Sequence, residues 1–362
     1  MSAPLVLLAA GGTGGHVLPA EALAGALAAR GFRLALVTDD RGARYGGELG
    51  KLETHRLPLR KMTGGLARKF LGALSLIPGF LAARTLIARL RPAAVVGFGG
   101  YPSLPTLAAA AVARVPAALH EQNAVLGRTN RLIAGRADAI AGSFARTRGA
   151  PDAVHVGNPV RAAAIGLRAS TYVIPAPGGE LRLLVTGGSQ GASIFGRVVP
   201  AAVSALAPEL RARLRIVQQT RAEDADAVTA AYAEMGVAAE VAPFFADLPA
   251  RIADAQIAVA RAGASTVAEL ACIGRPAILV PYPHATDDHQ TANAEALAQA
   301  GGAWTVADAE FTPAWLAARL EALLADPAPL ARMAQAAWGF GKPDAAERLA
   351  DLVEKLAQRR AA

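Results

Sequence analysis

LVLLAAGGTGGH at residues 5–16 and LRLLVTGGSQGA at residues 181–192 share one pattern, a short apolar run followed by a glycine-rich turn. An aliphatic run without polar alternation is typical of a strand buried on both faces of a parallel sheet. The glycines leave backbone N–H groups uncovered at the entry to the following helix, where a phosphate can bind. Each stretch therefore predicts the first strand and loop of a separate nucleotide-binding-like α/β domain.

Further apolar runs, separated by alanine-rich helical patterns, extend both halves outward from these stretches. Pro19–Arg30 predicts a helix that ends at Gly31. The uniform apolar runs favour the α/β class, with two Rossmann-like domains whose parallel sheets face each other across a cleft. The predicted strands are Pro4–Ala10, Phe32–Thr38, Ala93–Gly97 and Ala117–His120, then Leu181–Thr186, Arg215–Gln219, Ala239–Ala242, Ile257–Ala260 and Ala277–Val280.

Turn residues accumulate at Gly157-Asn158-Pro159-Val160, and a weakly patterned stretch follows. We therefore expect an N-terminal domain over residues 1–160 and a C-terminal domain over residues 161–344. The amphipathic segment Asp344–Arg360 predicts a last helix, over about residues 345–362. Its pattern does not identify a docking partner, and packing back on the first domain is one arrangement.

Composition excludes several classes of protein. The 362 residues are 53% apolar and 18% charged, which allows a large core and excludes wholesale disorder. A single cysteine, Cys272, excludes a disulfide framework and a cysteine-ligated metal site. The uncharged stretch between Arg91 and Arg114 contains glycines and prolines that a membrane-spanning helix tolerates poorly, and the N-terminus lacks the cationic start of a signal peptide.

Charge is shared unevenly between the halves. Residues 1–157 carry 19 Lys and Arg against 8 Asp and Glu, whereas residues 158–362 carry 18 against 21. No acidic residue lies between Glu53 and Glu121, and such a basic region attracts anionic partners. Such partners are nucleic acid, an anionic membrane surface or a phosphorylated substrate, and the sparse aromatic residues in this region argue against nucleic acid. The membrane-facing patch is predicted from Leu66, Phe70, Leu71, Leu74, Leu76, Ile77, Phe80 and Leu81, interleaved with Arg68, Lys69 and Arg84.

The glycine loops exclude two familiar nucleotide sites. Neither fits G-x-G-x-x-G, which argues against a nicotinamide dehydrogenase, and no G-x-x-x-x-G-K-[ST] is present. A third loop, GFGGY at residues 97–101, is followed by HEQN at residues 120–123. Because four consecutive polar side chains are costly to bury, we expect HEQN to form a loop that reaches into the cleft.

Seven motifs in order and with matching spacing give the chain a resemblance to the MurG family. They are GGTGGHVLPA (11–20), GFGGYPSLP (97–105), HEQNAVLGRTN (120–130), GNPVR (157–161), GGSQGA (187–192), RAGASTVAEL (261–270) and PYPHATDDHQTANA (281–294). The resemblance implies a GT-B fold and an inverting transfer of N-acetylglucosamine from UDP-N-acetylglucosamine to the C4 hydroxyl of N-acetylmuramic acid in lipid I, undecaprenyl-pyrophosphoryl-MurNAc-pentapeptide. The product is lipid II, a peptidoglycan precursor. It also implies a peripheral location on the cytoplasmic face of the plasma membrane, with no cofactor and no required metal.

The same resemblance assigns roles to single residues near the sugars and the base. Thr13, Gly14 and Gly15 match the loop that approaches the donor sugar and the acceptor. Asn123 matches an asparagine that contacts N-acetylglucosamine. Phe245 falls where the uracil is contacted, largely through the backbone.

Other matches surround the diphosphate and the ribose. Arg161 and Ser189 match residues at the donor diphosphate, where charge accumulates as the bond to the sugar breaks. Gln290 matches a contact to a sugar hydroxyl. The helix entry beneath the nucleotide is matched by Ala264, Ser265, Thr266 and Glu269, with Glu269 at the ribose hydroxyls.

Two residues are candidates for the general base that deprotonates the acceptor. His16 follows the first glycine loop at a helix start, where the helix dipole disfavours a charged imidazolium. Glu121 is the other candidate, and the sequence does not choose between them. The alternatives for the whole chain are a UDP-sugar transferase of the same fold with another lipid or a soluble acceptor, and a UDP-sugar epimerase.

Overall fold

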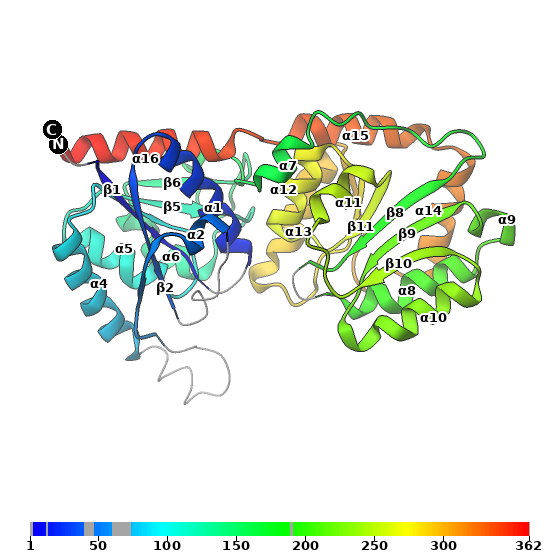
Figure 1. Ribbon diagram of the computed structural model, residues 1–362, viewed down its shortest axis with the longest axis horizontal. Coiled ribbons are helices and arrows are strands. Elements are labelled where there is room, and N and C mark those ends of the chain that lie inside the picture. Colours follow the sequence, from blue (N-terminus) through cyan, green and yellow to red (C-terminus); the bar gives the residue numbers. More distant parts are fainter. Residues whose placement is uncertain (1–2, 12–13, 40–46, 60–73, 189–190, 362) are drawn as a thin grey trace. The chain divides into compact units, whose positions relative to one another are not determined.

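The computed structural model describes residues 3–11, 14–39, 47–59, 74–188 and 191–361. It divides into two compact units, one of Met1–Arg161 with Asp344–Ala362 and one of Ala162–Pro343. Each unit is a parallel sheet with helices on both of its faces (Figure 1). The predicted class, two Rossmann-like α/β domains, is confirmed.

The first unit contains a seven-stranded sheet in the order β3-β2-β1-β4-β5-β6-β7. Its elements are β1 (Leu5–Ala9), α1 (Gly14–Ala29), β2 (Arg33–Thr38), α2 (Gly47–Gly50), β3 (Glu53–Arg56), α4 (Leu76–Leu90), β4 (Ala94–Gly97), α5 (Ser103–Val112), β5 (Ala117–Glu121), α6 (Arg128–Ile133), η2 (Ala134–Arg136), β6 (Ala139–Gly142), β7 (Val154–His155) and α16 (Ala345–Ala361). The sheet reverses its order between the neighbours β1 and β4, so their carboxyl ends form a switch point at which such folds bind ligands.

The second unit repeats this topology with a six-stranded sheet in the order β10-β9-β8-β11-β12-β13. Its elements are α7 (Ala162–Gly166), β8 (Leu181–Thr186), α8 (Ser193–Ser204), α9 (Pro208–Arg211), β9 (Leu214–Gln219), η3 (Ala222–Asp224), α10 (Ala225–Glu234), β10 (Ala238–Ala242), α11 (Leu248–Asp254), β11 (Ile257–Ala260), α12 (Ala264–Ile273), β12 (Ala277–Leu279), η4 (Thr286–Asp288), α13 (His289–Gln299), β13 (Ala303–Thr305), α14 (Pro313–Ala325) and α15 (Ala328–Phe340). Its switch point lies between β8 and β11.

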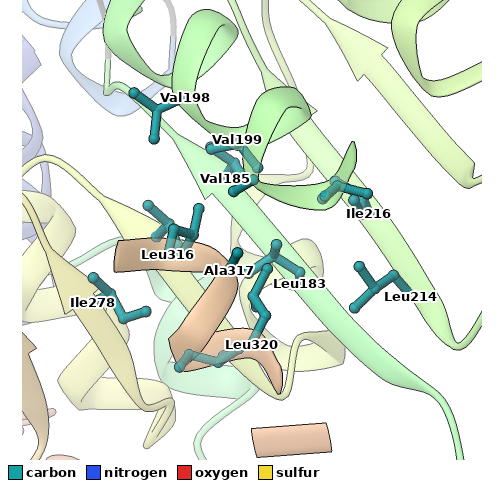
Figure 2. Packing of buried hydrophobic residues seen from close by; sticks show 14 of the residues in the cluster. Leu183, Val185, Val198, Val199, Leu214, Ile216, Ile278, Leu316, Ala317 and Leu320 are labelled. Carbon is teal, nitrogen blue, oxygen red and sulfur yellow. The ribbon is translucent and has the colours of Figure 1, made fainter. Parts of the chain in front are cut away.

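Both faces of each sheet are buried, as the uniform apolar runs predict. In β1, Val6 and Leu8 pack with α1 and α16 on one face, while Leu5 and Leu7 pack toward α4 and α5 on the other. This follows from the two-residue period of a strand. In the second unit one face of the sheet packs against α8 and α14 (Figure 2).

The last helix packs against the first helix of the chain. Leu349, Val353 and Leu356 of α16 join the core that contains Leu23 and Leu27 of α1. Among the described residues no helix combines the length and the apolar character needed to cross a membrane.

Some elements differ from their predictions. Helix α1 begins at Gly14 rather than at Pro19, which lies within its second turn and costs one backbone hydrogen bond. Strand β3 was not predicted, because its sequence ETHR is polar and largely exposed. β3, β7 and β13 lie at sheet edges, where one-sided contact gives a weak apolar pattern.

Candidate active site

Two glycine-rich loops meet at the switch point of the first unit. A Cβ built at Gly11 would lie 2.6 Å from Pro102 Cγ, and one at Gly100 would lie 3.0 Å from the carbonyl oxygen of Gly11. Gly99 and Gly100 have φ angles of +89° and +76°, a region that favours glycine. The loops after β1 and β4 therefore approach more closely than residues with side chains allow.

His16 lies over this junction, in the first turn of α1. A Cβ at Gly99 would be 3.1 Å from Cε1 of His16, so the imidazole rests on the glycine backbone. Its Nδ1 is 2.9 Å from Oε1 of Gln122. No hydrogen bond of Nε2 is recorded to any residue that the structure describes, and the side chain is only half-buried.

A chain of contacts continues from His16 into the interior. Nε2 of Gln122 lies 2.9 Å from Nδ1 of His120 and 3.0 Å from the carbonyl oxygen of His120. Nε2 of His120 lies 3.2 Å from the carbonyl oxygen of Gly157. Burial lowers the pKa of His120 to about 4, so this imidazole is neutral near pH 7.

The carboxylate of Glu121 is fully engaged. One oxygen accepts hydrogen bonds from the backbone N–H of Asn123 at 3.0 Å and from its Nδ2 at 3.2 Å. The other accepts from the backbone N–H of Gly127 at 2.9 Å and from Nδ2 of Asn130 at 2.7 Å. Glu121 is 1% exposed. Its hydrogen bonds to Asn123 and Gly127 hold the turn that follows β5 and fix the position of Asn123.

The prediction that HEQN forms a loop was wrong for its first three residues. His120 and Glu121 end strand β5, and both are buried together with Gln122. The cost of burial is offset because each side chain has hydrogen-bond partners. We call His16, His120, Glu121, Gln122 and Asn130 the histidine cluster. Sequence reasoning assigned no role to Gln122 or Asn130, although both lie within the motif at residues 120–130.

The switch point of the second unit is built differently. A Cβ at Gly187 would lie 2.3 Å from the backbone nitrogen of Ala192, so the loop after β8 closes directly over this glycine. Thr186 donates to Oε1 of Gln219 at 2.7 Å, and Nε2 of Gln219 donates to the carbonyl oxygen of Gly188 at 3.1 Å. Sequence reasoning also assigned no role to Thr186 or Gln219. Each is the last residue of a strand, β8 and β9, and this position at the carboxyl edge of the sheet could have identified them.

Helix α12 follows β11, the strand that pairs with β8, and no side chain caps its N-terminus. The N-cap residue is Gly263. The hydroxyl oxygen of Ser265 is buried and has no partner among the described residues. Ala264 and Glu269 are buried, and Thr266 is half-buried. Free N–H groups and an unpartnered hydroxyl suit an anion.

Gln290 holds the turn that leads into α12. Its Oε1 accepts hydrogen bonds from the backbone N–H of Ala262 at 3.2 Å and of Tyr282 at 3.0 Å. Asn293, one turn further along α13, donates to the carbonyl oxygen of Ala262 at 3.0 Å. The Gln290 amide nitrogen has no hydrogen bond to a described residue. We call the amide cluster the set of Thr186, Gly187, Gly188, Gln219, Ala262, Gly263, Ala264, Ser265, Gln290 and Asn293.

The other predicted site residues are placed as follows. Gly14 and Gly15 begin α1, and a Cβ at Gly14 would meet no described atom within 4 Å. Phe245 is buried beneath the guanidinium of Arg251, 4.8 Å from its ring centroid, whereas the ring of Phe244 is exposed. Arg161 is half-buried and ends the first segment of the first unit. Thr13 and Ser189 lie outside the described residues.

No group of three His, Cys, Asp or Glu side chains in the described part of the chain is arranged to hold a metal ion. Asp224 and Asp226 lie at the start of α10, where Asp224 is half-buried and Asp226 is exposed.

Comparison with known proteins identifies relatives of both units. The model of the glycosyltransferase family 28 N-terminal domain matches residues 6–142, and that of the C-terminal domain matches residues 182–349. A Rhodospirillum centenum protein named UDP-N-acetylglucosamine--N-acetylmuramyl-(pentapeptide) pyrophosphoryl-undecaprenol N-acetylglucosamine transferase is 57% identical, over 98% of this chain and 94% of that protein. A protein of the same name from Paramagnetospirillum magneticum is 55% identical, over 98% of this chain and 97% of that protein.

Solved structures of similar fold are also known. The crystal structure of MurG from Acinetobacter baumannii superposes with a TM-score of 0.80 at 30% identity, over 97% of this chain and 99% of that chain. A UDP-GlcNAc 2-epimerase from Neisseria meningitidis, bound to UDP-GlcNAc, has a TM-score of 0.65 at 10% identity, which shows a shared fold alone.

Proposed function

Because this chain belongs to glycosyltransferase family 28 and is a transferase that moves N-acetylglucosamine from UDP-N-acetylglucosamine onto lipid I to make lipid II, we propose that His16 is its general base. The observation that supports this most is the hydrogen bonding of the imidazole ring: Nδ1 is held by Gln122, whereas Nε2 has no hydrogen bond to a described residue. Glu121 has no comparable free atom, since both of its oxygens accept two hydrogen bonds.

The proposed reaction is a single inverting displacement. Nε2 of His16 takes the proton of the C4 hydroxyl of N-acetylmuramic acid while that oxygen forms a bond to C1 of N-acetylglucosamine. The bond between C1 and the diphosphate oxygen breaks, and UDP leaves with the electron pair. Asn123, held by Glu121, and Gly14, where a side chain would meet no described atom, are proposed to face the sugars.

The amide cluster is proposed to bind the donor. The N–H groups at the start of α12 and the unpartnered Ser265 hydroxyl supply donors for the leaving diphosphate. Arg161 and Ser189 are proposed to add to them. We propose that Glu269 contacts the ribose, that the backbone near Phe245 contacts the uracil, and that the amide nitrogen of Gln290 contacts the sugar. In this arrangement protein donors do the work of a divalent ion, so we expect turnover to persist in EDTA.

Comparison of two substitutions tests the base. His16→Ala is expected to lower kcat for lipid I by about 10²–10⁴-fold, the usual contribution of a general base, and to leave the unfolding midpoint unchanged. Glu121→Gln keeps the shape of the buried group but turns one acceptor into a donor, so it is expected to destabilise the protein while the surviving folded enzyme keeps much of its kcat. A near-native rate in His16→Ala would remove the assignment.

We propose that the enzyme is a peripheral protein that rests on the cytoplasmic face of the plasma membrane through the patch at α4. Leu74, Ile77 and Leu81 expose about half or more of their surface, at 46%, 61% and 53%. Arg84 and Arg89 are exposed further along α4. Exposed apolar side chains beside cations suit an anionic bilayer, with about 1 kcal/mol from each cation near the surface.

Parts of this predicted patch cannot contribute or lie outside the description. Phe80 packs against the core of the first unit rather than facing outward. Leu66, Arg68, Lys69, Phe70 and Leu71 lie outside the described residues.

Sedimentation with vesicles that contain anionic phospholipid tests the surface. Ile77→Glu with Leu81→Glu is expected to abolish most binding, because it replaces apolar contact by like-charge repulsion. A matched control is Val173→Glu with Ile174→Glu, which changes two exposed apolar residues of the second unit. Equal loss in both variants, or in neither, would contradict the proposal.

A further inference from the structure

We propose that Gln122 and His120 are positioning residues that hold His16 in its Nδ1–H tautomer, so that the lone pair of Nε2 faces the acceptor hydroxyl. This rests on the proposed role of His16 as the base. Of the two neutral tautomers, only this one can accept a proton at Nε2.

The backbone carbonyl of His120 fixes the orientation of the Gln122 amide. A carbonyl oxygen only accepts, so the amide atom 3.0 Å away must be the NH₂ group of Gln122. The flipped amide would place two oxygens together. The oxygen of Gln122 therefore faces Nδ1 of His16 at 2.9 Å, and because this oxygen also only accepts, Nδ1 must carry the proton.

His120 completes the chain at its other end. The same NH₂ group lies 2.9 Å from Nδ1 of His120, so this nitrogen must be the acceptor and the His120 proton must be on Nε2. There it donates to the carbonyl oxygen of Gly157 at 3.2 Å. The carbonyl oxygens of His120 and Gly157 can only accept, so one arrangement of protons satisfies every contact from Gly157 to His16.

The chain is rigid and carries no net charge. Gln122 is 2% exposed and His120 is fully buried, with its ring 5.6 Å from that of Phe98. An amide sets the tautomer of His16 without the negative charge by which a carboxylate favours imidazolium. Once Nε2 of His16 has taken a proton, Nδ1–H still donates to Gln122.

Nitrogen-15 spectra of the histidine side chains test the inference directly. At about pH 9, well above the ordinary imidazole pKa of about 6.5, the wild-type protein is expected to show His16 protonated at Nδ1 and His120 at Nε2. The six histidines are assigned by substituting them one at a time. A wild-type His16 protonated at Nε2 would overturn the proposal without any variant.

Variants of Gln122 separate positioning from mere packing. Gln122→Met keeps the size but offers no acceptor, so His16 is expected to populate the Nε2–H form and kcat to fall about 10²-fold, with KM for both substrates near wild type. Gln122→Glu keeps an acceptor opposite Nδ1 and is expected to retain the Nδ1–H signal. Thr106→Val is the control, since it removes another buried hydrogen bond of this unit, to the carbonyl oxygen of Pro102, without touching the chain.

The outcomes distinguish this inference from the proposed function. A Gln122→Met protein whose His16 spectrum matches wild type would refute the positioning role, even if His16→Ala is inactive. A spectrum that shifts as expected while His16→Ala keeps its rate would support the positioning and refute the base.

Discussion

The two units share one strand order but carry different chemistry at the same edge of the sheet. In the histidine cluster, hydrogen bonds join His16, Gln122 and His120 and join Glu121 to Asn130, and Nε2 of His16 has no hydrogen bond to a described residue. In the amide cluster, side chains such as Gln219 and Gln290 bond to backbone, and backbone N–H groups are left over at α12. The fold therefore fixes where a site can form, and the residues at the strand ends fix what it does.

This difference fits the two demands of glycosyl transfer. Removing a proton needs a group in a defined protonation state, which neighbouring side chains can set. Stabilising a departing diphosphate needs several donors aimed at one place, which a helix start and a tight glycine turn provide without titration.

The largest effect should come from adding a methyl group to each glycine loop. In Gly187→Ala the new Cβ would meet the backbone of Ala192, so the loop must move, and kcat/KM for UDP-N-acetylglucosamine is expected to fall about 10²-fold. The rise in melting temperature caused by this nucleotide should also shrink. Gly14→Ala should fold normally, because its Cβ meets no described atom within 4 Å, and should reduce that rise less than Gly187→Ala does. If Gly14→Ala lost more of the rise in melting temperature than Gly187→Ala, the assignment of donor binding to the second unit would be wrong.

A smaller effect concerns pH, and only the histidine cluster should show it. His120 has its pKa lowered from 6.5 to about 4, so between these values the unfolded chain binds a proton that the folded protein does not. Stability is therefore full above pH 6.5 and is lost as pH falls, by about 2 kcal/mol from pH 8 to pH 5. Denaturant titrations of wild type and His120→Asn measure it. An equal loss in the variant would assign the effect to other groups.

The smallest effect tests the attachment of the last helix to the first unit. Arg30 pairs with Glu347, Asp351 and Glu354 of α16 at 2.6, 2.7 and 3.1 Å, on a side chain 22% exposed. Arg30→Ala is expected to cost about 1 kcal/mol, less at high salt. The control Arg348→Ala removes an exposed pair with Asp344, the residue just before α16, and should cost less. Equal costs would mean that the ion pairs of Arg30 do not fasten the helix.

Much of the fold could be predicted from local sequence. The strands β1, β4 and β11 are continuous apolar runs, β8 is apolar apart from Arg182 and Thr186, and glycines mark the loops after β1, β4 and β8. The short strands β7 and β13 were missed, since they contain two and three residues at sheet edges and bury one side. Their pairing is decided by the neighbouring strand rather than by their own pattern.

The candidate site was predictable as a set of residues but not as a set of roles. His16 and Glu121 were equal candidates because both are polar groups near glycine loops. The structure separates them, since Glu121 is enclosed by four donors and His16 is not.

The sequence by itself determined two parallel sheets with phosphate-suited loops, because unbroken apolar strands and glycine turns act over a few residues. Only the tertiary structure decided that Nδ1 of His16 is held by a side chain while Nε2 has no hydrogen bond to a described residue. Gln122, which holds Nδ1, is 106 residues away along the chain, and a hydrogen bond depends on distance and direction in space.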